Sequence, residues 1–471
     1  MAKEYYTTIG LEIHAELATE SKMFCGCKND PDETRPNVNI CPVCMAHPGT
    51  LPVPNKTAIE SVVKVGLALG GTVADFTEFD RKNYFYPDIP KGYQISQYKF
   101  PIVSGGELAG VKITRVHLEE DTGTSKHDKG DFSLVDYNRA GVPLMELVTE
   151  PVIHSPEDAG KFGRELQLTL QYLGVSEANM EKGEMRVELN ISVSDNPEKF
   201  GTKVEVKNIN SFSAMMRAAK YETERMSKLL EEGRGAEIVQ ETRGWDEVKQ
   251  KTFSQRSKED SHDYRYFPDP DIPKFYLSKL FDIESLRQGL PELPSQKRLR
   301  YKEAFGIKDE DIESYINDAL LASWFEDVAK ILEVKEKIAT ASNYITSDYI
   351  GLKKKNAEIK LPTAEHFAEL VTLVTEEKIS SRAAKDILSS IVVNDESPLK
   401  IATEKDLFQK NDEGALKDIV QKLIDTHPDI VATYKAGKEN AIMSLVGKAI
   451  KETNGSANPQ VVIKLLKELL A

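Results

Sequence analysis

The sequence contains no uninterrupted apolar segment approaching the roughly 18 residues that a membrane-spanning helix needs. Its first residues, MAKEYYTTIGLEIH, also lack the apolar stretch of a secretory signal peptide. We therefore expect a cytoplasmic protein that has no membrane partner.

Several familiar catalytic motifs are missing as well. The sequence has no GxxxxGK[ST] phosphate loop and no GxGxxG turn after a predicted strand, so a nucleotide site on this chain must be of another kind. It also has no GxSxG nucleophile elbow. We therefore expect no hydrolytic nucleophile here.

Basic residues are in the minority. The chain has 62 lysines and arginines against 76 aspartates and glutamates, which gives a formal net charge of -14. This balance excludes a non-specific nucleic-acid coat, because such proteins use a basic surface to displace counterions from phosphates. It does not exclude recognition of tRNA by one local face. A chain of 471 residues that is 40% hydrophobic can form two to four domains.

Cysteine is scarce and confined to one region. The four cysteines are Cys25, Cys27, Cys41 and Cys44. The spacing is CxC, a loop, then CxxC, and two such close pairs let four thiolates converge tetrahedrally on one Zn²⁺. Because four thiolates leave no open coordination position, we predict a structural zinc site. The alternatives are four reduced, buried cysteines or a redox pair, although no βαβ pattern surrounds CPVC.

Alternating polar and apolar residues predict strands in the first part of the chain. In GLEIHAEL, Leu11 and Ile13 fall on one face, and Glu12 and His14 on the other. The segments MRVELNISV and KVEVKNIN alternate in the same way. This pattern favours an antiparallel sheet whose polar face carries charged groups.

Helical patterns follow the strands. Ser155 can cap a helix that begins at Pro156 and ends before Gly174, and Thr363 can cap another. After about residue 292 the pattern is almost continuously helical, with a further compositional break near residue 405. We predict an α+β domain with the zinc site over residues 1–292, a helical domain over 293–405 and a small helical tail over 406–471.

A group of acidic residues suggests a metal site. Glu146 lies in the apolar run VPLMELV, where an unpaired carboxylate would cost several kcal/mol and therefore needs a cation. Other members of the group are Glu12, His14, His117, Glu119, Glu120 and Asp121. Carboxylates and an imidazole on rigid strands suit a Mg²⁺ that also binds water and nucleotide phosphate. The alternative for each acid is a surface carboxylate or an ion-pair partner.

Two segments combine basic and aromatic residues. They are FDRKNYFYPDIPKGYQISQY and HDYRYFPDPDIP, which include His262 and Asp263. Their cations can hold phosphates and their aromatics can stack, or the segments can simply fasten the sheet to its flanking loops. The residues that we predict for cofactor binding are Arg81, Lys82, Lys91, Arg186, Lys207 and Arg265.

Together the motifs resemble the B subunits of the aspartyl/glutamyl-tRNA amidotransferases. The segments that carry the resemblance are GLEIHAEL, CPVCMAHPGTLPVPN, FDRKNYFYPDIPKGYQISQY, RVHLEEDTG, DYNRAGVPLMELVTEP, VEVKNINSF, QETRGWDE and HDYRYFPDPDIP, in that order. The ending GKENAIMSLVGKAIKETNGSANPQ is similar to the tRNA-contacting tail of that family.

The resemblance implies a catalytic domain similar to glutamine synthetase, then a helical domain and a small helical tail. It implies ATP-dependent phosphorylation of the side-chain carboxylate of Glu-tRNA(Gln) or Asp-tRNA(Asn), followed by amidation. The implied cofactors are ATP and Mg²⁺, in addition to the Zn²⁺ that the cysteine spacing predicts. The implied partners are a glutaminase A subunit that supplies ammonia, a small C subunit and the mischarged tRNA.

The resemblance also implies a ligand set for Mg²⁺. The family's ligands fall on His14, Glu120 and Glu146, with Glu12, Glu119 and Glu150 adjacent. Strand alternation instead groups Glu119 with His117. A bulge or turn before Asp121 could change that grouping, so both glutamates stay in consideration. The sequence departs from the family pattern after CPVC, where Ala46 and His47 stand, and His47 is an alternative zinc ligand.

The last region carries local positive charge. Lys438, Lys448 and Lys451 lie in an otherwise acidic protein, and Asn458 can cap a helix that begins at Pro459. We expect this tail to contact tRNA, the alternative being that it packs on a partner subunit. The alternative to an enzymatic function is that the protein is a non-catalytic, zinc-stabilised tRNA-binding scaffold.

Overall fold

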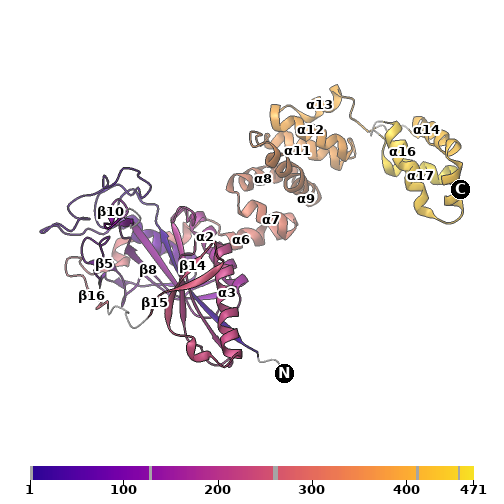
Figure 1. Ribbon diagram of the computed structural model, residues 1–471. Helices are drawn as coiled ribbons and strands as arrows, with labels where there is room; N and C mark the ends of the chain where they lie inside the picture. Colours follow the sequence, from indigo (N-terminus) through magenta and orange to yellow (C-terminus); the bar gives the residue numbers. More distant parts are fainter. Residues whose placement is uncertain (1–3, 127–129, 258–263, 410–412, 454–456, 471) are drawn as a thin grey trace. The chain divides into compact units, whose positions relative to one another are not determined.

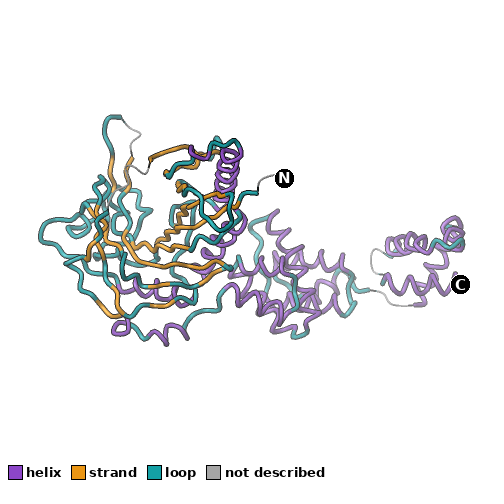
Figure 2. The backbone as a smooth tube through the Cα atoms, turned by 90° about the horizontal axis from the view of Figure 1, so that it is seen from below, coloured by secondary structure: helices purple, strands orange, loops and turns teal. Residues whose placement is uncertain are grey.

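The structure is a computed structural model that describes residues 4–126, 130–257, 264–409, 413–453 and 457–470. The chain divides into two compact units, Met1–Pro294 and Ser295–Ala471 (Figure 1). Among the described residues, the strands lie in the first unit, and the second unit is built from helices (Figure 2). The predicted α+β class is therefore confirmed. The separate tail domain after residue 405 stays a prediction.

The first unit is organised by a large sheet. Its strand order in the described chain is β15-β14-β13-β12-β1-β11-β8-β6-β2, with β7 added beside β8. These strands are β1 (Tyr6–Glu16), β2 (Thr72–Val73), β6 (Val103–Ser104), β7 (Glu107–Leu108), β8 (Val111–Glu120), β11 (Pro143–Thr149), β12 (Met185–Ser194), β13 (Val204–Lys207), β14 (Glu241–Asp246) and β15 (Lys251–Ser257).

Smaller sheets flank the large one. They pair β3 (Phe76–Thr77) with β17 (Phe275–Tyr276), β9 (Thr124–Lys126) with β10 (Leu134–Asp136), and β4 (Asp80–Asn83) with both β5 (Tyr93–Ser96) and β16 (Phe267–Pro268). The β4–β16 pairing sets Phe267 opposite Arg81. This pairing therefore joins the two segments described above that combine basic and aromatic residues.

The large sheet is antiparallel, as predicted, except at one pair. Strand β1 runs antiparallel to both β11 and β12, whereas β13 and β14 are parallel. A parallel pair needs a long crossover connection, usually a helix. Helix α3 (Phe212–Glu231) supplies it, because it lies between β13 and β14 in the chain.

One face of the sheet is apolar and forms the core of the first unit. Ile13 is fully buried and lies opposite Leu147 on β11 and Val187 on β12. The core also includes residues of α1 (Lys56–Ala68), α2 (Pro156–Tyr172) and α3. Because side chains alternate along a strand, the intervening residues must point to the other face, where the polar groups gather.

The helix boundaries in this unit follow local signals. The Ser155 hydroxyl accepts a hydrogen bond from the backbone N–H of Asp158 at 3.0 Å, and Pro156 begins α2 as predicted. Gly174, just after the helix, has a positive φ of 65°, a conformation that glycine adopts without strain. The short helices among the described residues of this unit are η1 (Gly235–Glu237), α4 (Leu277–Leu280) and α5 (Ile283–Gln288).

The second unit consists of short helices. In chain order they are α6 (Pro294–Arg300), η3 (Tyr301–Phe305), α7 (Asp309–Ile316), α8 (Ala319–Leu332), α9 (Lys335–Asn343), η4 (Tyr344–Tyr349), α10 (Ile350–Lys355), α11 (Ala364–Thr375), α12 (Ser381–Asn394), α13 (Pro398–Glu404), α14 (Glu413–Thr426), α15 (Pro428–Lys435), η5 (Glu439–Ala441), α16 (Ile442–Glu452) and α17 (Pro459–Leu470).

The last helices share a core of their own. Leu423, Leu445 and Leu466 belong to one buried cluster on α14, α16 and α17. Asn458 caps α17 as predicted, because its side-chain oxygen accepts from the N–H of Gln460 at 2.9 Å. Thr363 precedes α11, but its side chain makes no capping bond. Within the described residues, no helix is long and apolar enough to cross a membrane.

Candidate functional site

The polar face of the large sheet brings a histidine and two carboxylates together. His14 on β1 lies opposite Glu146 on β11. The His14 Nε2 atom is 3.5 Å from Glu146 Oε2 and 3.5 Å from Oε1 of Glu119, which comes from β8. One ligand atom from each of these three residues lies within 4.8 Å of the others. Two carboxylates and an imidazole at this spacing form a donor set that fits a divalent metal ion.

Glu119, and not Glu120, belongs to this cluster. Residues 119 and 120 pair in regular order with Leu144 and Pro143, and the register shift of this strand pair lies at the far end, between Val148 and Thr149. Alternation along β8 therefore continues to its last residue and turns Glu120 to the opposite side. The expectation that Glu120 joins His14 and Glu146 is not met in the structure.

Glu120 has a separate set of partners. Its Oε2 accepts from Lys91 Nζ at 2.8 Å, and its Oε1 accepts from the backbone N–H of Ile95 at 3.0 Å. The backbone carbonyl of Glu120 accepts from the side-chain amide of Gln94 at 2.6 Å. These contacts fix the carboxylate of Glu120 against β5.

The two other acids predicted nearby differ in position. Glu12 lines the same cavity as the cluster, and its carboxylate accepts from the Asn190 amide at 2.7 Å. Glu150 does not line it, because β11 ends at Thr149 and the Glu150 carboxylate accepts from the Thr114 hydroxyl at 2.7 Å in a solvent-exposed position.

A cavity of about 410 Å³ opens over the cluster. Its charged lining residues are Glu12, His14, Lys82, Arg115, His117, Glu119, Asp121, Glu146, Arg186, Glu188, Glu205 and Lys207. Glu188 and Glu205 were not predicted as site residues, although each is on the polar face of an alternating segment. Arg115 was not predicted as a site residue either. It lies two residues before His117 on the same strand, so strand alternation places both on one face and could have identified it.

Electrostatic pairing keeps the cluster charged. Burial alone would lower the pKa of His14, but a hydrogen bond to Glu146 and the nearby carboxylates raise it to about 9. Burial would raise the pKa of Glu146, yet the two imidazoles of His117 and His14 hold it well below its usual value. Burial opposes the charge of Lys82 too, but Glu119 and Glu146, together with nearby tyrosines, more than offset it, so that the pKa of Lys82 lies above its ordinary value.

Three of the predicted cofactor-binding cations line this cavity. They are Lys82, Arg186 and Lys207. Arg186 forms an ion pair with Asp121, and Lys207 Nζ lies 2.8 Å from both Glu188 and Glu205. Arg81 and Lys91 line a different cavity, and Arg265 lines neither of the two. His262 and Asp263 lie outside the described residues.

Tyrosines form one wall of the cavity. Tyr98 and Tyr266 are stacked with ring centroids 4.5 Å apart, and Tyr264 contacts Tyr266 edge to face. The ammonium of Lys82 lies 5.1 Å from the centroid of the Tyr264 ring. Aromatic faces beside a cation can bind a planar ring that carries phosphates.

The four cysteines converge as predicted. One sulfur from each of Cys25, Cys27, Cys41 and Cys44 lies within 4.8 Å of the others, and all four are free. A hydrogen bond from the Cys25 thiol is the main factor that lowers the pKa of Cys44 to about 5, although burial opposes it. Four convergent sulfurs fit a tetrahedral Zn²⁺. His47 is not part of the cluster.

A buried lysine lies next to the cysteine cluster. Lys22 is fully buried, its Nζ donates to the Tyr137 carbonyl at 3.1 Å, and its backbone N–H donates to the Cys27 carbonyl at 2.9 Å. A Cβ on Gly141 would lie 3.5 Å from Lys22 Cδ and 3.9 Å from Cys44 Cβ. Lys22 therefore lies near Cys44, and its charge is one of the factors that lower the pKa of Cys44.

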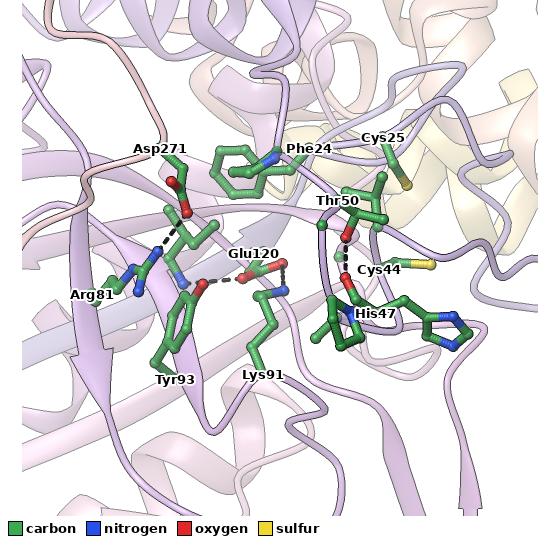
Figure 3. A pocket seen from close by; sticks show the side chains of 17 residues that line it. Phe24, Cys25, Cys44, His47, Thr50, Arg81, Lys91, Tyr93, Glu120 and Asp271 are labelled. Carbon is green, nitrogen blue, oxygen red and sulfur yellow. Dashed lines mark hydrogen bonds and ion pairs between the residues drawn. The ribbon is translucent and has the colours of Figure 1, made fainter.

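A second cavity, of about 310 Å³, separates the cysteine cluster from Glu120 (Figure 3). Cys25 and Cys44 lie on one side, and Lys91, Tyr93 and Glu120 face them across the pocket. Arg81 pairs with Asp271 at 2.8 Å along the same wall. Glu120 therefore belongs to the surroundings of the cysteine cluster.

The fold and the first cavity define an α+β protein with a candidate divalent-metal site on the polar face of its sheet. The family model described as the GatB/GatE catalytic domain matches residues 7–281, and the one described as the GatB domain matches residues 323–470. The chain belongs to the GatB/GatE family.

Curated relatives match it from end to end. A protein of Persephonella marina is 44% identical over 99% of this chain and 100% of its own length. A Thermotoga maritima protein is 44% identical, and one from Brevibacillus brevis 42%, each over 99% of both chains. All three are named as the B subunit of an aspartyl/glutamyl-tRNA(Asn/Gln) amidotransferase.

Proposed function

We propose that the chain is the activating subunit of a tRNA-dependent amidotransferase. It uses ATP to activate the side-chain carboxylate of glutamate or aspartate esterified to tRNA. The name shared by full-length relatives supports the substrate class. The observation that carries the proposal is the cluster of His14, Glu119 and Glu146, whose ligand atoms lie within 4.8 Å of one another.

The cluster is the proposed binding site for Mg²⁺. Bound there, Mg²⁺ supplies positive charge that offsets the charge developing on a phosphoryl group. His14, Glu119 and Glu146 would hold it, each from a different strand of the sheet. Rigid strands keep these donors in place without a large entropy loss on binding. Glu12 lines the same cavity and is available to bind a metal-bound water.

Lys82, Arg186 and Lys207 are the proposed phosphate-binding residues. They reach the cavity from β4, β12 and β13. Ammonium and guanidinium groups bind phosphate oxygens strongly where solvent is partly excluded. The carboxylates that now pair with Lys207 and Arg186 keep these side chains directed into the cavity until phosphate replaces them. The tyrosine wall offers a stacking face for a base.

The proposed reaction has two steps. An oxygen of the substrate carboxylate attacks the γ-phosphorus of ATP, the bond to the β-phosphate oxygen breaks, and ADP leaves. Ammonia then attacks the carbonyl carbon of the acyl phosphate, and inorganic phosphate leaves with the former carboxylate oxygen. A carboxylate needs this activation because its own oxygen is a poor leaving group.

The proposal includes partner subunits. The sequence has no hydrolytic nucleophile motif, so ammonia would come from glutamine on a separate glutaminase A subunit, with a small C subunit fastening the pair. The zinc site would stabilise the domain at residues 1–292. The helices at 293–405 would link it to a tRNA-binding tail at 406–471.

The test is an assay for amidated aminoacyl-tRNA. The purified chain is combined with the A and C subunits, glutamine and mischarged tRNA, with and without ATP and Mg²⁺. We expect amidated product only when both are present, and loss of product with Glu146→Gln. A complex that binds tRNA and never consumes ATP would support the scaffold and overturn the proposal.

A further inference from the structure

His117 is a buried histidine next to the carboxylate cluster. It is 2% exposed and lies directly opposite Glu146 in the pairing of β8 with β11. Its Nε2 atom is 3.1 Å from Glu146 Oε2 and 3.9 Å from Glu119 Oε2. Among the contacts that Glu146 makes with cationic side chains in the described structure, this one is the shortest.

The two nitrogens of the His117 ring have different surroundings. The Nδ1 atom is buried and has no hydrogen-bond partner in the described structure, whereas Nε2 faces Glu146. A proton on Nε2 satisfies the carboxylate, and only an acceptor lone pair is then left unpaired at Nδ1. The opposite tautomer would bury an unpaired N–H and set two lone pairs against each other. The geometry therefore favours donation from Nε2–H to Glu146.

A nitrogen that donates its proton to a carboxylate cannot give a lone pair to a metal ion. The group that can share one ion is His14, Glu119 and Glu146, and it does not include His117. Glu146 Oε2 lies 3.5 Å from His14 Nε2 and 3.1 Å from His117 Nε2, between the two rings. Hydrogen-bond partners of ligating carboxylates fix their orientation, and removing one typically weakens metal binding by about 10–100-fold.

We propose that His117 is a positioning residue, which holds the Glu146 carboxylate in the orientation that binds the divalent metal ion. This inference rests on the proposed function, because it assumes the metal site. His117 contributes one N–H, fixed by the strand register. A buried carboxylate without that donor would turn toward Arg115, whose guanidinium lies 3.9 Å from Glu146 Oε1.

The experiment measures Mn²⁺ binding to the full chain by electron paramagnetic resonance, without substrate. His117→Leu removes the donor at similar volume, and His117→Gln places an amide N–H near the position of Nε2. His154→Leu is the matched control, because His154 is an exposed histidine whose Nδ1 contacts the Thr7 carbonyl. We expect the Mn²⁺ Kd to rise about 10–100-fold in His117→Leu, to return to within a few-fold in His117→Gln, and to stay unchanged in His154→Leu.

Two results would overturn the inference. One is a His117→Leu protein that binds Mn²⁺ as tightly as wild type. The other is a folded His117→Gln protein that binds as weakly as His117→Leu, because the ring would then act in some way other than by donating at Nε2. Far-UV circular dichroism of each variant verifies folding.

Failure of the proposed function gives a different result. In that case wild type shows no tight Mn²⁺ site, or Glu119→Gln binds Mn²⁺ as well as wild type does. A second readout in the reconstituted complex separates positioning from chemistry. The Mg²⁺ concentration for half-maximal amidation should rise in His117→Leu, while the rate at saturating Mg²⁺ stays near that of wild type.

Discussion

Glu119 and Glu120 are neighbours on β8, yet their carboxylates face two different cavities. Glu119 Oε1 lies 3.5 Å from His14 Nε2, and Glu120 Oε2 lies 2.8 Å from Lys91 Nζ on the other side. The one-residue step along the strand thus separates a candidate metal ligand from a buried ion pair.

This separation predicts that only one of two conservative substitutions weakens metal binding. Glu119→Gln removes a charged ligand, so we expect metal binding by the chain to weaken by at least about tenfold and amidation to fail. Glu120→Gln leaves the His14 cluster intact, so we expect metal binding within a few-fold of wild type. Isothermal titration with Mn²⁺ compares the two, and equal losses in both variants would contradict the assignment.

Lys22 should help to retain zinc. A zinc ion with four thiolates carries a net negative charge, and the buried Lys22 is close enough to Cys44 for its charge to lower the pKa of that thiol. We expect Lys22→Met to release zinc to a chelator about tenfold faster than wild type, in line with the usual effect of losing a neighbour of metal ligands.

The controls for zinc retention use the same assay. Lys28→Met removes an exposed lysine that pairs with Asp30 at 2.6 Å, and it should behave as wild type. Wild type should contain about one zinc per chain, and Cys41→Ser should lose zinc and soluble yield. An unchanged rate of zinc release from Lys22→Met would exclude an electrostatic role for this lysine in zinc retention.

The second unit should lose stability in acid through Glu326. Burial opposes ionisation of this carboxyl, but bonds from Arg300 and Tyr301 lower its pKa to about 2. A lowered pKa stabilises the folded state above the unfolded pKa, and the effect is lost as pH falls toward the folded value. Because the side chain is 26% exposed, we expect Glu326→Gln to cost about 1–2 kcal/mol at pH 7.

Urea unfolding in a Trp245→Phe background tests this, because Trp324 on α8 then reports on the second unit. The stability difference that Glu326→Gln causes in this background should be constant from pH 8 to about pH 5 and shrink below it. A difference that does not change down to about pH 3 would show that packing, and not charge, accounts for the effect.

The tail should contribute tRNA affinity. Its helices share a separate buried core, so a chain that ends after residue 405 should keep the first unit folded and the zinc bound. We expect the truncated complex to bind tRNA more weakly and with a smaller salt dependence, because phosphate contacts of Lys438, Lys448 and Lys451 are lost. Binding at two salt concentrations measures both. Unchanged affinity and salt slope would instead favour packing of the tail on a partner subunit.

Local patterns were enough to predict much of the fold. Alternation placed Leu11 and Ile13 in the core and His14 on the polar face, and Ser155 marked the start of α2. The cysteine spacing predicted a four-sulfur cluster, because each close pair is held by its own short loop. These features depend on residues near one another in sequence, where backbone geometry fixes the outcome.

Other features depend on pairings between distant segments. The register that sets His14 opposite Glu146 and Glu146 opposite His117 follows from packing of whole strands, which no short motif encodes. Lys22 has no sequence signal of burial, since lysine is usually exposed. The choice between Glu119 and Glu120 shows the limit of a resemblance, because two adjacent glutamates can both be aligned with one ligand, and strand parity separates them.

In the proposed reaction the substrate carboxylate attacks ATP, and transfer of an isotope from that carboxylate to phosphate reports on this step. Glu-tRNA or Asp-tRNA labelled with ¹⁸O in the side-chain carboxylate is amidated by the reconstituted complex, and the released phosphate is analysed by mass spectrometry. An acyl-phosphate intermediate moves one carboxylate oxygen to phosphate, so we expect one ¹⁸O in each phosphate formed with amidated product. Phosphate without the label, released at the same rate as amide, would exclude an acyl-phosphate intermediate.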